Sequence, residues 1–318
     1  MCKYKLQRYQ NKIIEVLNSM ASYKKCKPTF QSIGNFLEKF DKIFSLSYDP
    51  IIYWSILNNK INFKDYFLKI DPDNELIFSP DADKFKNSES SRDSSFIYYI
   101  HGALFLYKNE NNKICKIKAT EENSLRNIVK FYTIDQHKYP MVVLEGTYFE
   151  KIKNIYSCDY LLKAYCKLSK LGRNSNLENS ESENGILNDI CVLGFSANEK
   201  DQHIINAICN NGRGTRVTLC IYEEGLDDDG NIITNVAEEQ YGDFIKSMQD
   251  NNIIVDYYNA FTSKVIPKGN VDQDNGTEEE EEEEPPPDSD DEFLFPWLFP
   301  QTFTNPIKIQ KPGHKNPG

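Results

Sequence analysis

Three apolar segments of the chain end in polar residues of types that can take part in ligand binding or proton transfer. The first segment ends in 45–49, Ser-Leu-Ser-Tyr-Asp, and the second in His101-Gly102. The third ends in 194–198, Gly-Phe-Ser-Ala-Asn, with Asp201 and His203 close behind. Ligands of open α/β sheets bind beyond the carboxyl ends of the strands. If these segments are parallel strands, we expect the three polar groups to line one crevice.

Each of these residues also has a purely structural interpretation. Asp49 precedes Pro50 and can cap a helix, while His101 in an apolar strand is more often a hydrogen-bonded core histidine than a catalyst. Gly194 can allow close packing of a strand and a helix, and Ser196 can act as a cap. His203, one turn into an amphipathic segment, can face solvent. Only the three groups taken together favour a binding site.

The elements that would position these residues alternate along the chain. Apolar runs predict strands over 42–48, 96–106, 113–118, 140–145, 190–195, 216–222 and 253–258. Helical spacing of apolar residues predicts helices over 6–22, 28–40, 51–57, 121–131, 158–171, 200–209 and 238–248. The polar stretch 61–92 is predicted to be a loop or insertion, and 225–230 a turn. Alternating strands and helices predict a doubly wound, mostly parallel α/β sheet with an added hairpin at 113–118.

The chain divides into a body, residues 1–268, and a tail, residues 269–318. Thirteen acidic residues between 272 and 292 outweigh the formal net charge of −11, so the body is close to neutral. The glutamate run 278–284 and the prolines 285–287 cannot pack into a core, so the tail is expected to be disordered. The aromatic segment 293–300 either docks on a protein partner or folds back onto the body.

Composition excludes several classes of protein. The eight cysteines form no CxxC pair and the chain has four histidines, so no metal site is predicted. The chain shows no signal-peptide pattern, no apolar run of about 20 residues that would span a bilayer, and no nucleic-acid recognition motif. A Ser-His-Asp hydrolase is not indicated either. We expect a cytoplasmic protein that binds neither membranes nor nucleic acid; its oligomeric state stays open.

The order of the polar groups resembles the motifs of sirtuin-like proteins, which have an NAD-binding fold. Ser45–Tyr53 is similar to their Thr-x-Asn-Tyr-Asp segment, 100–104 to their His-Gly segment, and 194–196 to their Gly-x-Ser segment. The chain more closely resembles a bacterial sirtuin-like family of unknown function. The matching blocks are Tyr48-Asp49 with Tyr53-Trp54, 101–104, Tyr139-Pro140 with 145–147, and Gly194, Ser196, Asp201, His203 and Ile204.

The resemblance implies an NAD-like nucleotide as substrate or ligand. It implies that His101 acts beside the nicotinamide ribose, and that Ser47 stands where the family has the asparagine that orients the reacting groups. The remaining residues implied to contact the nucleotide are Asp49, Gly102, Gly194, Ser196 and Asp201. If the protein is an enzyme, we expect an NAD glycohydrolase of the bacterial defence type. A deacetylase is not expected, because the zinc module of those enzymes is absent.

Two departures from the family pattern keep other functions open. No glycine-rich phosphate loop precedes residue 40, where the only glycine, Gly34, falls in a predicted helix. The chain as given therefore either begins after the first strand and loop or lacks them. Ser47 also lacks the amide donor of asparagine. The alternatives are a catalytically impaired nucleotide sensor or scaffold, and an interaction protein that acts through the acidic and aromatic tail.

Overall fold

The structure is a computed structural model, and it describes residues 23–69, 76–80, 95–117, 128, 131–132, 138–143, 146–171, 188–221 and 234–259. The predicted helix 6–22, the turn 225–230 and the tail 269–318 lie outside these residues, as does most of the predicted helix 121–131.

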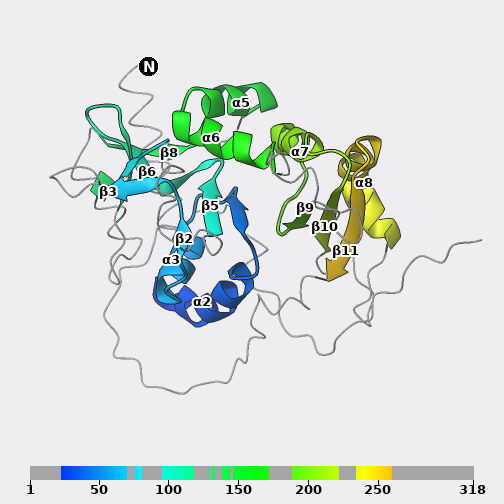
Figure 1. The fold of residues 1–318 in the computed structure, drawn as a ribbon, viewed down its shortest axis with the longest axis horizontal. Coiled ribbons are helices and arrows are strands. Elements are labelled where there is room, and N and C mark those ends of the chain that lie inside the picture. Colours follow the sequence, from blue (N-terminus) through cyan, green and yellow to red (C-terminus); the bar gives the residue numbers. More distant parts are fainter. Residues whose placement is uncertain are drawn as a thin grey trace, which may run out of the picture.

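The described strands form three sheets (Figure 1). A first parallel sheet has the order β1-β5-β2, a second parallel sheet has the order β11-β10-β9, and a five-stranded antiparallel sheet has the order β3-β4-β7-β6-β8. The strands are β1 (Lys42–Ser45), β2 (Phe63–Lys64), β3 (Phe67–Lys69), β4 (Leu76–Phe78), β5 (Ser95–Tyr99), β6 (Gly102–Lys108), β7 (Ile114–Lys116), β8 (Tyr139–Val142), β9 (Asn188–Val192), β10 (Thr215–Ile221) and β11 (Ile254–Asn259). The predicted mixture of helices with parallel strands is confirmed. The described parallel strands form two separate sheets, however, and the predicted strand 140–145 pairs in the antiparallel one.

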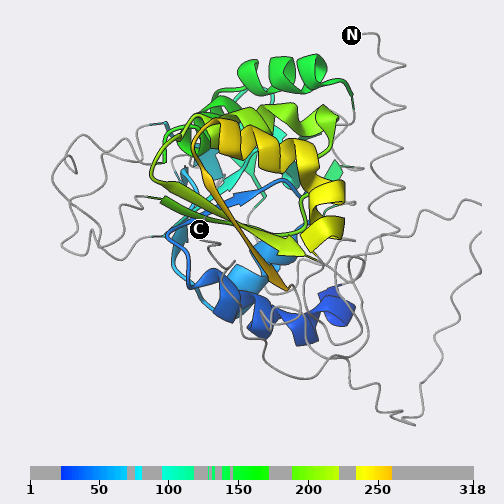
Figure 2. The same cartoon turned by 90° about the vertical axis from the view of Figure 1, so that its right-hand side faces the viewer.

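The described helices pack against one another in pairs that follow the chain. They are α2 (Tyr23–Leu37), α3 (Ile51–Asn58), α5 (Tyr148–Tyr156), α6 (Asp159–Leu168), η2 (Glu199–Asp201, a 3-10 turn), α7 (Gln202–Cys209) and α8 (Thr234–Asp250). Strands β9, β10 and β11 are adjacent in chain order, and right-handed crossovers between such strands place their helices on one face. Accordingly α7 and α8 contact each other beside this sheet (Figure 2).

The chain passes from the first parallel sheet to the antiparallel sheet at His101. Strand β5 ends at Tyr99 and β6 begins at Gly102, so the single strand predicted over 96–106 is wrong. The backbone on both sides of this turn is bonded to other strands: the Ile100 amide donates to the Ser45 carbonyl (3.0 Å), and the Val143 amide donates to the His101 carbonyl (2.8 Å). His101 is therefore held at the junction of two sheets.

Of the two alternatives predicted for 61–92, a loop or an insertion, the loop is wrong for the part that the structure describes. Strands β2, β3 and β4 lie in this stretch, and they are two or three residues long. Such short strands give too few residues for a period of two to be visible in the sequence. Their register is set by pairing with β5 and β7 instead.

Gly34 has a packing role in α2. A Cβ at this position would lie 2.2 Å from Asn59 Nδ2, and that amide donates to the carbonyls of Phe30 (2.6 Å) and Ser55 (2.7 Å). The glycine therefore lets α2 approach the end of α3. Within the described residues no helix is both long and apolar enough to cross a membrane.

Gly102 provides a test of the junction. Its φ is +77°, and a Cβ here would lie 1.9 Å from the Met141 carbonyl oxygen. We expect Gly102→Ala to lower the free energy of unfolding by at least about 2 kcal/mol, because backbone strain and the clash both oppose the native turn. Urea unfolding of both forms measures the change.

The matched control is Gly242→Ala in α8, where a Cβ has nothing within 4 Å. This change should leave stability unchanged or raise it by up to about 1 kcal/mol. Equal effects at the two glycines would contradict the role assigned to Gly102.

Candidate functional site

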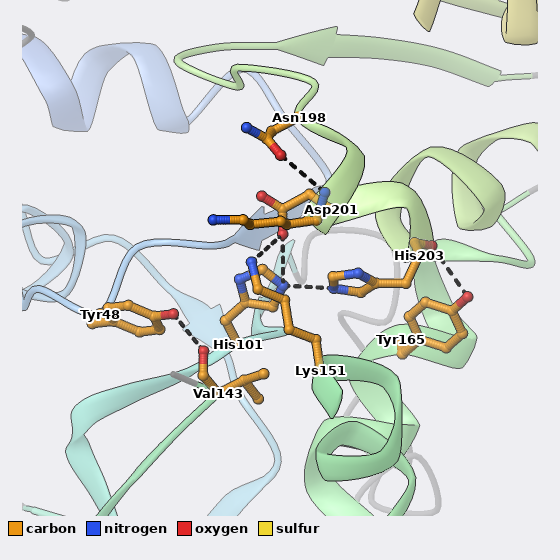
Figure 3. Close-up of polar contacts among 9 residues, drawn as sticks. Tyr48, His101, Val143, Lys151, Tyr165, Asn198, Asp201 and His203 are labelled. Carbon is orange, nitrogen blue, oxygen red and sulfur yellow. Dashed lines mark hydrogen bonds and ion pairs between the residues drawn. The ribbon is translucent and has the colours of Figure 1, made fainter. Parts of the chain in front are cut away.

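Two histidines that lie far apart in the sequence meet at the junction of the sheets (Figure 3). His101 Nε2 lies 2.7 Å from His203 Nε2, a hydrogen bond between rings whose centroids are 5.0 Å apart. His101 is 4% exposed and His203 is 0% exposed. The structural interpretation of His203 as a solvent-facing residue is therefore wrong, and the two rings form a buried pair.

A buried ion pair lies beside the histidines. Lys151 Nζ donates to Asp201 Oδ1 over 2.7 Å, and the same oxygen is 3.9 Å from His101 Nε2. The second distance is too long for a hydrogen bond. Figure 3 shows these contacts converging on the Asp201 carboxylate. The four side chains thus form one cluster, which we call the histidine cluster: His101, Lys151, Asp201 and His203.

Burial keeps both imidazoles neutral at neutral pH. It lowers the pKa of His101 well below its ordinary value; the neighbouring His203 and Lys151 lower it further, and Asp201 opposes them. Burial likewise lowers the pKa of His203, which Asp201 raises and Lys151 lowers. The His101–Asp201 contact is therefore not an ion pair, and the charges of Lys151 and Asp201 cancel. A site with no net charge and two neutral bases results.

The elements that carry these side chains begin with capped turns. In α5 the Thr147 hydroxyl accepts from the Glu150 amide, while the Glu150 carboxylate accepts from the Thr147 amide. This capping box places Lys151 one turn above Ile155 on the buried face of α5. Asn198 Oδ1 accepts from the Lys200 amide (2.9 Å) and starts η2, which leads directly into α7. Asp201 and His203 therefore lie where α7 begins.

Ser47 and Asp49 form a second polar group at the end of β1. The Ser47 hydroxyl donates to Asp49 Oδ2, and the Ile51 amide donates to Asp49 Oδ1 (2.8 Å). Through the second bond Asp49 caps the first amide of α3 from the residue before the N-cap position, which Pro50 occupies. Tyr48 connects this group to the cluster, because its ring lies 6.5 Å from the His101 ring and its hydroxyl donates to the Val143 carbonyl.

The predicted nucleotide contacts in the third group lie on a loop that follows β9. Gly194 (φ +65°) and Ala197 (φ +51°) both adopt left-handed backbone, and Ser196 is exposed. Among the described residues no hydrogen bond joins Ser196 or Gly194 to the histidine cluster. Of the predicted site residues, His101 and Asp201 come together, whereas Ser47 and Asp49 bond to each other and Gly102 shapes the turn.

Lys151 is the residue that sequence reasoning missed. Its signal was present, since Lys151 shares the apolar face of an amphipathic helix with Ile155 and Tyr148, but no helix was predicted there. The spacing of cysteines and histidines predicts no metal site, yet His101, Asp201 and His203 offer ligand-type atoms that all lie within 4.8 Å of one another. A rule based on short spacing in the sequence cannot find residues that are a hundred positions apart.

The cluster can accept and share a proton. Two neutral imidazoles joined by one hydrogen bond can take a proton from a bound hydroxyl or water only where the resulting cation is stabilised, because burial lowers both pKa values; the Asp201 carboxylate opposes that shift. Tyr148 and Tyr165 enclose His203, with ring centroids at 6.2 and 6.4 Å, and the Tyr165 hydroxyl donates to the His203 carbonyl (3.1 Å). The position of the base is therefore fixed by surrounding groups.

One family model matches most of the chain. It is described as "Domain of unknown function (DUF4917)" and covers residues 3–266. No curated protein matches the chain.

Substitution of Lys151 tests the ion pair. Lys151→Met keeps the length of the side chain and leaves Asp201 without its cation, so we expect the free energy of unfolding to fall by about 2 kcal/mol. Adding Asp201→Asn to this variant should restore part of the loss, because a neutral amide is cheaper to bury than an unpaired carboxylate. Strictly additive losses in this double-mutant cycle would contradict the pairing.

Asp49 provides a test with a defined pH dependence. Burial raises the pKa of Asp49 above its ordinary value of 3.8, although the bonds from Ser47 and Ile51 oppose the shift. The folded state therefore favours the protonated carboxyl, and this stabilisation, present below 3.8, is lost as the pH rises through the higher folded value. Asp49→Asn removes the titration and can keep the cap.

We expect the stability of Asp49→Asn relative to the unmodified chain to increase from pH 4 to pH 7. Asp49→Ala should instead lose about 1 kcal/mol, since it also removes the cap. Thermal unfolding at both pH values measures these differences. A constant difference for Asp49→Asn would show that the carboxyl titrates alike in the folded and unfolded chains.

Proposed function

Given that the chain belongs to the DUF4917 family, whose description assigns no activity, we propose from the site itself that it binds an NAD-like dinucleotide and hydrolyses the bond between nicotinamide and ribose. The observation that carries the proposal is the buried contact of 2.7 Å between His101 and His203. It fixes a neutral base at the carboxyl ends of parallel strands, where open α/β sheets bind nucleotides.

The arrangement of the strands supports this location. Tyr48 and His101 follow the carboxyl ends of β1 and β5, which run parallel with Ser45 opposite Tyr99. Asp201 follows β9 of the other parallel sheet. The contact between His101 and His203 supports a single site to which segments following both sheets contribute. We therefore propose that the two sheets are parts of a doubly wound, sirtuin-like fold.

The residues present fit a dinucleotide in two respects. The Lys151 ammonium, which is paired with Asp201, can instead pair with a phosphate of the dinucleotide. The loop that leads to η2 has left-handed backbone at Gly194 and Ala197, a conformation found in turns that bind anions. The dinucleotide supplies the bond to be cleaved, and its leaving pyridinium nitrogen takes up the electron pair of that bond. The histidine pair holds the attacking water and accepts its proton, and Asp201 stabilises the charge on the protonated pair.

A second candidate is a nucleotide sensor or scaffold without turnover. The bond from the Ser47 hydroxyl to Asp49 favours it, because the donor at the position of the family asparagine is engaged by a helix cap. Binding without nicotinamide release identifies this case. The function proposed for the acidic and aromatic tail stays a prediction, since residues 269–318 lie outside the described part. A defence role also stays a prediction.

We further propose that the protein acts in the cytoplasm. None of the seven cysteines within the described residues forms a disulfide; three of them are half-buried and four are buried. Free thiols in such number are typical of proteins from a reducing compartment.

Nicotinamide release from NAD tests the proposed reaction. We expect His101→Ala to lower the rate at least about 100-fold, the loss typical of a general base. His314→Ala, in the tail, is the matched control and should keep the full rate. A thermal shift with NAD reports binding separately from turnover. If the unmodified protein shows neither nicotinamide release nor a thermal shift with NAD, both the hydrolase and the sensor are refuted.

A further inference from the structure

We propose that His101, Asp201 and His203 bind a divalent ion of the Zn²⁺ class, which replaces the Lys151 ammonium at the Asp201 carboxylate. The proposal goes beyond the proposed function, because it needs no dinucleotide. It rests on three potential ligands and on the cation that now lies beside one of them.

The ligand chemistry fits a borderline metal ion. Imidazole nitrogen and carboxylate oxygen are common zinc ligands, and zinc takes the neutral form of histidine, the form that burial favours in both rings. The two Nε2 atoms already face one another, and both rings are buried. Three protein ligands would leave one position open for water or another molecule, as in catalytic zinc sites.

The distances require modest adjustment. Zinc bonds of about 2.1 Å bring two ligand atoms no more than about 4.2 Å apart. In the structure the three ligand atoms lie within 4.8 Å of one another, with 2.7 Å between the Nε2 atoms and 3.9 Å from His101 Nε2 to Asp201 Oδ1. An ion between them would move the rings apart by some tenths of an ångström and draw the carboxylate inward.

Lys151 explains how the site can be stable without an ion. Its ammonium lies 2.7 Å from Asp201 Oδ1, the oxygen that would bind the metal. A divalent ion and an ammonium repel strongly at such a distance. Binding therefore requires Lys151 to leave this oxygen, which its flexible four-carbon stem permits. The lysine acts as a competitor of the ion.

The outer contacts of the site limit its affinity. His203 Nδ1 is buried and has no hydrogen-bond partner within the described residues. A metal on Nε2 places the proton on Nδ1, where ligating histidines normally donate to an oxygen, and loss of such a partner typically costs about 10–100-fold in affinity. We therefore infer that the site binds its ion with lower affinity than a structural zinc centre and releases it more readily.

Titration of the full chain with zinc chloride, without nucleotide, tests the proposal. A competing chromogenic chelator measures the affinity, and we expect one ion per chain. His203→Gln should weaken binding at least tenfold. Lys151→Met should strengthen it by at least roughly tenfold, because it removes the competing charge. A gain in affinity cannot result from misfolding, so this variant keeps the test valid if His203→Gln fails to fold.

Accessible thiols are the alternative zinc ligands, and a triple variant controls for them. Cys166, Cys191 and Cys209 are the half-buried cysteines, and their joint replacement by serine should leave the affinity unchanged. Zinc binding that survives His203→Gln, that disappears with the thiols, or that is equal in Lys151→Met and the unmodified chain would overturn the proposal. None of these outcomes depends on nicotinamide release, so this proposal and the proposed function can fail separately.

Discussion

The hydrogen bond between His101 and His203 connects parts of the chain that share no strand pairing. His101 lies where β5 of the first parallel sheet turns into β6 of the antiparallel sheet, and His203 lies in the first turn of α7 beside the second parallel sheet. This contact of 2.7 Å between two buried rings joins the turn between the first parallel sheet and the antiparallel sheet to the helix beside the second parallel sheet. The chemistry that we propose for the site depends on this constraint.

The electrostatics of the cluster follow from its burial. An isolated charge in such a place would be costly, and the structure contains one cation and one anion in direct contact beside two neutral rings. Because of this balance, both imidazoles stay neutral. The Lys151 ammonium is bound to Asp201, and another cation can take its place. The same geometry therefore supports proton transfer and, on exchange of the lysine, metal binding. Metal binding requires Lys151 to leave the Asp201 carboxylate, whereas proton transfer does not.

Ser47 and Asp49 form a polar group of their own at the start of α3. The resemblance assigns them to a nucleotide, whereas in the structure the serine hydroxyl donates to the aspartate and the aspartate caps α3. Tyr48, between them in sequence, is the member of this segment whose ring approaches His101. Alternate residues of the segment thus face different neighbours, and only the middle one approaches the histidine cluster.

Elements whose signals are local can be read from the amino-acid pattern alone. Strands β1, β9, β10 and β11 and helices α3, α6 and α7 could be predicted, because apolar runs and helical spacing record burial within a few neighbouring residues. The bond from Asp49 to the start of α3 was also predictable, and His101 and Asp201, which the sequence pattern singles out, lie near each other in the structure. The separation into three sheets, the short strands β2 to β4 and the turn at His101 were not, since pairing between distant segments decides them. The approach of Lys151 and His203 to His101 could not be predicted, because contacts between residues 50 to 102 positions apart leave no periodic pattern in a single sequence.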